Sequence, residues 1–229
     1  MLLTKSTKLN HLKQNIVEVL NTIPSNVKLV AVSKTKPAED IIEAWNFGLK
    51  DFGENRVQEL IKKHEAINLP IDWHLIGHLQ TNKVKYIIPF VSLIQSVDSF
   101  KLLKEINKEA QKINRIVPCL LQVFIAKEET KFGFSFDELE AMLSSNEFIE
   151  LKNISVSGLM GMATYTENTK QVSKEFKSLY QVFDTLKTQY FSNQIQFKEI
   201  SMGMSGDYKI AIQEGSTIVR IGSLLFGGR

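Results

Sequence analysis

The chain has 229 residues, and 43% of them are hydrophobic, which is enough to bury one sizeable core in a single domain spanning residues 1–229. Its 28 lysines and arginines and its 25 acidic residues leave a formal net charge of +3, and the two kinds are interspersed, so nucleic-acid binding has little electrostatic support. One cysteine, Cys119, excludes an internal disulfide, and the lack of a long apolar run argues against a membrane span, so we expect a cytoplasmic protein.

Short apolar runs and stretches of helical periodicity alternate along the chain. The runs typical of strands cover residues 27–32, 50–53, 73–76, 93–97, 117–124, 154–160, 197–201 and 217–221. The helical patterns cover 38–47, 57–64, 100–113, 136–143 and 170–190, and residues 3–20 add a helix at the start. This order predicts a parallel sheet, and eight strands in this length predict a closed (β/α)8 barrel, a TIM barrel of the α/β class. An open doubly wound sheet is the alternative.

Lys34 directly follows the first apolar run, which ends in Val-Ala-Val-Ser. A lysine at the dry end of a buried strand can lose its charge, and the neutral amine is the form that attacks a carbonyl carbon. Lys34 is therefore a candidate for Schiff-base chemistry. The alternative interpretation is an ordinary solvated lysine at the end of a strand.

Two turns rich in small residues lie at the last two strands, in residues 201–206 and 217–223. Such turns let the backbone approach a phosphate closely, and in a barrel the loops after the last two strands commonly bind phosphate. An amine and a phosphate-binding turn in one site suggest pyridoxal phosphate. No Walker loop and no dinucleotide-binding glycine pattern accompanies the first strand, so nucleotide binding is disfavoured.

A barrel would bring further side chains to the same mouth, because the carboxyl ends of its parallel strands all face one side. Asn55 follows the second strand, although it could instead cap the next helix. His78 follows the third, and both it and His74 are more typical of hydrogen-bonded histidines than of metal ligands. Met160 ends the sixth strand and is a packing residue by type. Arg220 lies among apolar neighbours in the last strand, where its guanidinium needs an acceptor.

Six segments in chain order resemble the pyridoxal phosphate homeostasis protein family. They lie at residues 31–37, 52–55, 73–83, 158–162, 201–205 and 219–227, within a match that runs from about residue 27 to residue 228. The resemblance implies one (β/α)8 barrel like the N-terminal domain of alanine racemase, with pyridoxal 5'-phosphate held as an aldimine on Lys34. It also implies the other cofactor-binding residues: Ser201, Gly222 and Ser223 at the phosphate, Arg220 at the pyridine nitrogen, and Asn55 and Met160 along the ring. The family often has threonine where this chain has Ser223.

Arg220 bears on what such a cofactor could do. A guanidinium stays protonated and can only donate to the pyridine nitrogen, which leaves the ring a poor stabiliser of carbanions. The chain ends at Arg229 without a second domain, and Tyr165 is the tyrosine that we place near the mouth. We therefore expect a non-catalytic monomer that stores, buffers or delivers pyridoxal phosphate in cellular homeostasis, with apo forms of pyridoxal phosphate-dependent enzymes as partners. The alternative is an amino-acid racemase of the alanine racemase type, or another lysine Schiff-base enzyme such as a barrel aldolase.

Overall fold

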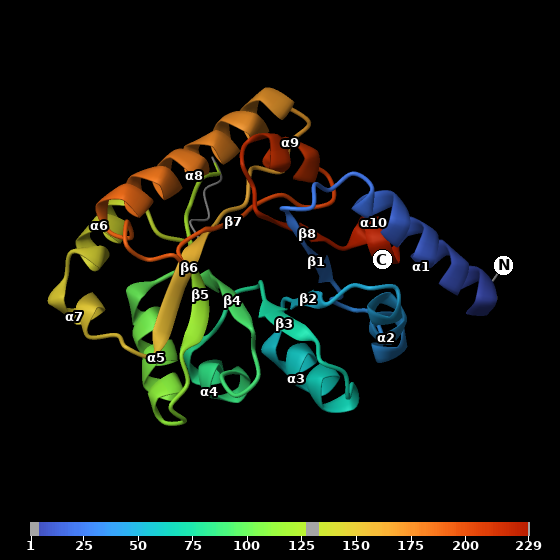
Figure 1. The fold of residues 1–229 in the computed structure, drawn as a ribbon, viewed down its shortest axis with the longest axis horizontal. Helices are drawn as coiled ribbons and strands as arrows, with labels where there is room; N and C mark the ends of the chain where they lie inside the picture. The colour runs from blue at the N-terminus through green and yellow to red at the C-terminus, as the bar shows by residue number, and fades with distance from the viewer. Residues whose placement is uncertain (1–4, 127–132, 229) are drawn as a thin grey trace.

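Eight parallel strands and the helices that connect them make up the computed structural model, which describes residues 5–126 and 133–228 (Figure 1). The strands are β1 (Lys28–Val32), β2 (Asp51–Glu54), β3 (Asp72–Leu75), β4 (Leu93–Val97), β5 (Val117–Gln122), β6 (Ile154–Met160), β7 (Glu199–Ser201) and β8 (Ile218–Ile221). The helices are α1 (Lys5–Leu20), α2 (Ala38–Asn46), α3 (Val57–Ala66), α4 (Val84–Ile87), α5 (Phe100–Gln111), α6 (Phe136–Leu143), α7 (Asn146–Ile149), α8 (Thr169–Gln189), α9 (Tyr208–Gln213) and α10 (Ser223–Phe226). A 3-10 turn, η1 (Thr81–Lys83), precedes α4.

The first strand pairs with both the second and the last, and this double pairing closes the sheet into a barrel. Residues 28–31 of β1 lie beside residues 218–221 of β8, and the strands follow one another around the barrel in chain order. The TIM-barrel prediction is confirmed, and the open doubly wound alternative is wrong because its sheet would have two free edges. All pairs are parallel, so the carboxyl ends of the eight strands open on one mouth.

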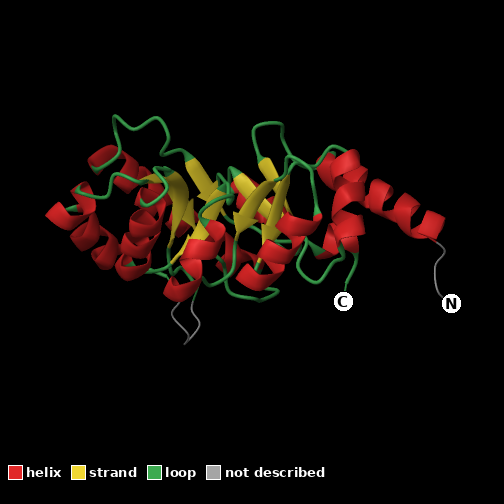
Figure 2. Ribbon diagram, turned by 90° about the horizontal axis from the view of Figure 1, so that it is seen from below, coloured by secondary structure: helices red, strands yellow, loops and turns green. Residues whose placement is uncertain are grey.

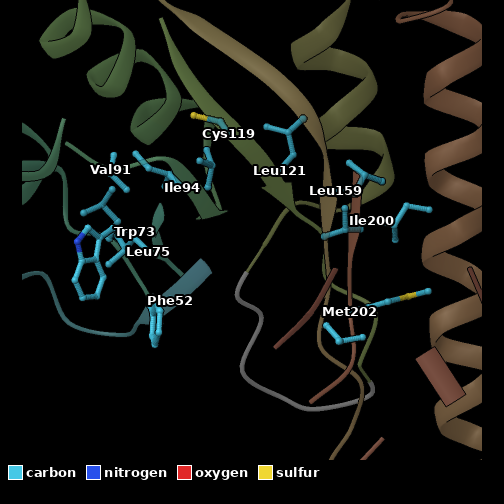
Figure 3. Close-up of a cluster of buried hydrophobic side chains, with 14 of the residues drawn as sticks. Phe52, Trp73, Leu75, Val91, Ile94, Cys119, Leu121, Leu159, Ile200 and Met202 are labelled. Carbon is cyan, nitrogen blue, oxygen red and sulfur yellow. The ribbon is translucent and has the colours of Figure 1, made fainter. Parts of the chain in front are cut away.

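The outward side chains of the strands form a continuous apolar core with the surrounding helices. Figure 3 shows part of it, in which Phe52, Trp73, Leu75, Leu121 and Leu159 come from four neighbouring or nearby strands. Burial of such large side chains contributes roughly 1.5–3 kcal/mol each relative to exposure, so this layer supplies most of the stabilisation of the barrel.

A second, smaller apolar cluster lies inside the barrel. It consists of Val30, Leu93, Leu120, Met160 and Ile218, one from each of five strands. Each of these residues is next in sequence to a member of the outer core, as the alternation of side chains along a strand requires. The barrel is therefore filled by side chains and is not a pore.

The helices surround the strands in two perpendicular views, and α1 lies at one side, against α2 and α10 (Figures 1 and 2). α1 buries Leu12, Ile16 and Val19, which are three or four residues apart and so share one face. Nδ2 of Asn15 donates to the carbonyl oxygen of Leu225 in α10 at 3.0 Å. The extra helix is thus fixed to the element that follows β8. None of the helices in the described ranges is long and apolar enough to cross a membrane.

Some boundaries differ from the sequence-based ranges for local reasons. β5 ends at Gln122 rather than at 124, because the amide of Phe124 donates to the carbonyl of Phe134 at 3.0 Å and so leaves the barrel ladder. Helices α4, α7, α9 and α10 have four to six residues each, which is too short for hydrophobic periodicity to reveal. Of the expected helix over 3–20, residues 3 and 4 lie outside the described ranges.

Gly158 in β6 supplies a test of the barrel pairing. Its φ of 149° favours glycine, and a Cβ at this position would overlap the carbonyl oxygen of Glu199 in β7. We expect Gly158→Ala to separate the two strands and to lower the free energy of unfolding by more than about 2 kcal/mol, measured by urea denaturation. Gly206→Ala is the control, because a Cβ there meets nothing within 4 Å. Equal stability of Gly158→Ala and wild type would contradict this pairing.

Candidate functional site

Lys34 lies at the mouth of the barrel, two residues beyond the end of β1 at Val32. Side chains alternate between the two faces of a strand, and Lys34 is four residues after Val30 of the inner cluster. The turn therefore begins with Lys34 on the side that faces the barrel interior. Lys34 is half-buried, and its Nζ makes no hydrogen bond or ion pair with residues 5–126 or 133–228. This amine is therefore available to a ligand in the mouth.

Lys36, two residues further on, is differently placed. Its Nζ donates to three carbonyl oxygens at the end of α10, those of Phe226 at 3.0 Å, Gly227 at 3.2 Å and Gly228 at 3.4 Å. A lysine ammonium has three N–H donors, and this arrangement uses them all. Lys36 ties the turn after β1 to the last helix and has no free donor left for a ligand.

The backbone on both sides of Lys34 is held by one group of charged residues. Nζ of Lys63 in α3 donates to the carbonyl oxygen of Ser33 at 2.7 Å, and the amide of Thr35 donates to Oε1 of Glu59 at 2.6 Å. Lys63 also bonds Oε1 of Glu54 and Oε1 of Glu59, each at 2.7 Å. We call Glu54, Glu59 and Lys63 the Lys63 cluster. It fixes the turn that carries Lys34, including Thr35 with its φ of 66°.

Glu54 and Lys63 of the cluster are buried between the barrel and α3, and Glu59 is partly exposed. Burial raises the pKa of Glu54, while the hydrogen bonds from Lys63 and Ser33 act in the opposite direction. Oε2 of Glu54 is buried and has no hydrogen-bond partner among the described residues. Burying these charges costs desolvation free energy. Removing one partner would cost more, because it would leave the other buried charge uncompensated.

The turns after β7 and β8 meet at the mouth beside β1. The amide of Gly222 donates to Oγ of Ser205 at 3.3 Å, and Ser223 follows as the first residue of α10. A Cβ on Gly222 would lie 3.0 Å from the carbonyl oxygen of Val32, so a larger residue would push this turn away from the strand that leads to Lys34 by a few tenths of an ångström. Gly203 has a φ of 94°, and a Cβ there would lie 2.6 Å from that of Ala211.

Arg220 is a buried cation directly below these turns. It is 4% exposed, and it donates to Oγ of Ser201 at 2.6 Å and to the carbonyl oxygen of Gly161 at 3.1 Å. Burial lowers the pKa of Arg220 to about 10, against the attraction of Asp207, so the side chain stays charged near neutral pH. The sequence predicts an acceptor for Arg220, and the structure provides two, the hydroxyl of Ser201 and the carbonyl oxygen of Gly161.

Ser201 was expected at a phosphate, and the structure gives its hydroxyl other contacts. The hydroxyl accepts from Arg220 and donates to Oε1 of Gln95 at 2.6 Å, within a fully buried setting. A phosphate role for Ser201 stays a prediction. Ser205, whose hydroxyl faces Gly222, was overlooked as a site residue although it stands in the same serine-rich turn.

The remaining predicted residues lie at the expected strand ends. Asn55 follows β2, and helix α3 has Arg56 as its N-cap, so the capping alternative for Asn55 is wrong. Met160 is fully buried in the inner cluster. Nδ1 of His78 lies 2.8 Å from Oδ2 of Asp98 at the mouth, whereas Tyr165 is 98% exposed. Among the described residues, no three His, Cys, Asp or Glu side chains come together to hold a metal ion.

Comparison with known proteins places the whole chain in one family. Residues 7–229 match the family model described as alanine racemase, N-terminal domain. The chain is 46% identical over 203 residues to the pyridoxal phosphate homeostasis protein of Aquifex aeolicus, covering 88% of this chain and 87% of that one. It is 36% identical over 214 residues to the protein of the same name from Synechocystis, covering 93% and 96%. The chain belongs to the pyridoxal phosphate homeostasis protein family.

Solved structures agree with this family. PipY of Synechococcus elongatus, solved with pyridoxal phosphate bound, matches 94% of this chain and 100% of its own, with a TM-score of 0.85 and 32% identity. Alanine racemase of Clostridium difficile covers 96% of this chain with a TM-score of 0.71 and 15% identity, and this chain covers 56% of the racemase. At that identity the racemase shares the barrel fold alone.

The Lys63 cluster gives a prediction about the turn that carries Lys34. Lys63→Met should lower the free energy of unfolding by about 3–5 kcal/mol, because Glu54 and Glu59 lose their buried counter-charge. It should also speed hydrogen exchange at the Thr35 amide, which Glu59 would no longer hold. Urea denaturation and amide exchange measure the two effects. Lys62→Met, one residue away and exposed, is the control and should change stability by less than about 0.5 kcal/mol. Equal effects of the two substitutions would mean that the cluster does not form.

Proposed function

We propose that this chain binds pyridoxal 5'-phosphate through Lys34 and acts in cellular homeostasis of the cofactor, by storing, buffering or delivering it. The observation that carries the proposal is the contrast between two neighbouring lysines. Nζ of Lys34 has no partner among the described residues at the barrel mouth, whereas Nζ of Lys36 is engaged by three carbonyl oxygens. An amine that no protein group engages is what an aldehyde requires as its reaction partner.

The residues around Lys34 fit the rest of such a ligand. The backbone N–H of Ser223 opens α10, and the first N–H groups of a helix have no acceptor within it. With the hydroxyls of Ser223 and Ser205 it offers donors where a phosphate could bind, beside Gly222, whose own amide donates to Ser205 Oγ. No lysine is needed to neutralise the phosphate there, which leaves Lys34 to the aldehyde. Asn55 and Met160 are the proposed neighbours of the ring.

Arg220 is proposed to face the pyridine nitrogen. When bound, pyridoxal phosphate supplies an aldehyde that condenses reversibly with amines and a ring that withdraws electrons most strongly when its nitrogen is protonated. Arg220 can only donate a hydrogen bond, since its pKa of about 10 keeps it charged near neutral pH. It would therefore leave that nitrogen without a proton. This favours holding the cofactor over catalysing carbanion chemistry.

The tyrosine that we placed near the mouth gives the racemase alternative little support. Tyr165 is 98% exposed, so its side chain packs against almost nothing. His78 and Asp98, which follow β3 and β4, form an acid–base pair at the mouth, with Nδ1 and Oδ2 2.8 Å apart. This pair is the observation that keeps a weak amino-acid racemase as the second candidate function.

We also propose that the protein is a cytoplasmic monomer and that it passes the cofactor to apo forms of pyridoxal phosphate-dependent enzymes.

Labelling tests which lysine bonds the cofactor. Reduction of the loaded protein with borohydride should fix a pyridoxyl group on Lys34, identified by peptide mass spectrometry. Lys34→Ala should lose both the visible absorbance of the loaded protein and the label. Lys36→Met is the matched control and should keep the label on Lys34, since Nζ of Lys36 is engaged by carbonyl oxygens at the end of α10. A pyridoxyl group on Lys36, or visible absorbance that survives in Lys34→Ala, would overturn the assignment.

Turnover and transfer assays separate the two functions. The loaded protein should restore activity to an apo form of a pyridoxal phosphate-dependent enzyme. It should racemise, transaminate or decarboxylate common amino acids far more slowly than the enzyme median of about 10 per second, because an arginine-paired ring stabilises carbanions poorly. The amino-acid assays are run with Lys34→Ala in parallel. Racemisation of alanine at an ordinary enzyme rate that disappears in Lys34→Ala would promote the racemase.

A further inference from the structure

A chain of hydrogen bonds crosses the interior of the barrel from Arg220 to its opposite end. Arg220 Nη1 lies 2.6 Å from Ser201 Oγ, which lies 2.6 Å from Gln95 Oε1. Gln95 Nε2 lies 2.8 Å from His74 Nδ1, and His74 Nε2 lies 3.1 Å from Asp51 Oδ1. We call these five residues the axial chain. His74, Gln95, Ser201 and Arg220 are all at most 4% exposed.

The axial chain connects the mouth of the barrel to its floor. Arg220 is in β8 and Ser201 ends β7, close to the mouth, whereas Asp51 is the first residue of β2. Gln95 in β4 and His74 in β3 link the two ends. At the floor a cavity of about 560 Å³ is lined by Asp51 and His74, so the far end of the chain is reached by solvent.

The chemistry of the groups gives every bond in the axial chain the same direction. Arg220 can only donate, so Ser201 accepts from it and uses its own proton toward Gln95. The amide oxygen of Gln95 is thereby occupied, and its NH2 group donates to Nδ1 of His74. Nδ1 must then be unprotonated, and Nε2–H of His74 donates to Asp51. With the Gln95 amide in this orientation, His74 accepts at Nδ1 and donates at Nε2.

The two ends of the axial chain carry opposite charges. Burial raises the pKa of Asp51, but its bonds to His74 and to Lys28 outweigh burial and leave the pKa below its usual value, so Asp51 is ionised. Arg220 is a guanidinium at the other end. Hydrogen bonds that all point from a cation to an anion polarise one another, which strengthens each of them.

We propose that Ser201, Gln95 and His74 are positioning residues that hold the Arg220 guanidinium in a fixed orientation, with Asp51 as the remote anchor. Combined with the proposed function, this makes the axial chain the device that sets how Arg220 meets the pyridine nitrogen. A polar chain through a core that apolar side chains could fill costs desolvation, so stability alone does not account for it. The need to orient the guanidinium of Arg220, at which the axial chain ends, does account for it.

The first experiment uses protein without cofactor, so it does not depend on the proposed function. The chain has only four arginines, Arg56, Arg115, Arg220 and Arg229, so 15N-arginine labelling gives few side-chain signals, and an Arg220→Lys spectrum assigns Arg220. Breaking the axial chain with Gln95→Met or His74→Leu should speed solvent exchange of the Arg220 Nη–H groups by about tenfold, the equivalent of one net hydrogen bond. His74→Gln should restore slow exchange, because a glutamine amide can also accept from Gln95 and donate to Asp51.

Ser216→Ala is the matched control. Its buried hydroxyl lies 2.8 Å from the carbonyl oxygen of Met202, just after β7, and 2.9 Å from that of Ile218 in β8, and it takes no part in the axial chain. It should lower the melting temperature and leave Arg220 exchange unchanged. Slow exchange at Arg220 in both Gln95→Met and His74→Leu would overturn the proposal, and so would a failure of His74→Gln to restore it. If Gln95→Met does not fold, His74→Leu against His74→Gln decides alone.

The second experiment uses protein loaded with 15N-labelled pyridoxal phosphate. His74→Leu should move the 15N resonance of the pyridine nitrogen and the visible absorbance band, and Ser201→Ala should move both in the same direction. His74→Gln and Ser216→Ala should leave them in place. Wild-type protein that binds no cofactor would defeat the proposed function while the exchange experiment still decides on the axial chain. If the cofactor binds and its pyridine 15N resonance is unchanged in His74→Leu, the claim that the axial chain orients Arg220 toward the ring is overturned.

Discussion

The pairing of β1 with β8 is the constraint on which the rest of the molecule depends. It brings residues near the start of the chain, at 28–31, beside residues near its end, at 218–221. As a result the turn that carries Lys34 lies next to the turn at Gly222, where a Cβ would come within 3.0 Å of the strand backbone. The Lys34 amine and the turn at Gly222, separated by almost two hundred residues, become neighbours only because the barrel closes. A sheet with this strand order that stayed open between β8 and β1 would leave them at opposite edges.

Strand alternation then assigns each polar residue to one of two separate structures. Asp51 in β2 and Asn55 directly after it share the inner phase, while Glu54 has the outer phase and meets α3. Asp51 therefore anchors the axial chain inside the barrel, and Glu54 joins the Lys63 cluster outside it. A shift of β2 by one residue would exchange the two carboxylates and destroy both structures. The short strand is specified by polar partners on both faces as well as by Phe52 in the outer core.

The parts that could be predicted from the sequence are those with a local pattern. The strands followed from apolar runs, Lys34 from its place after such a run, and the need of Arg220 for an acceptor from its apolar neighbours. Gln95 and Lys63 could not be found in this way. Lys63 is four residues from Glu59 on a helix, which is typical of a solvated surface pair, yet it is buried. Its role arises from Ser33 and Glu54, which only the tertiary fold brings to it.

The Lys63 cluster and the axial chain share no residue, and this separation matters for a protein that would hold a cofactor without using it. The cluster holds the backbone around Lys34, where the aldimine is proposed to form. The axial chain holds Arg220, which is proposed to face the pyridine nitrogen. Substitutions distant from one another usually have additive effects. On the proposed function, retention of the cofactor and restraint of its reactivity would therefore depend on different residues and could be adjusted one at a time.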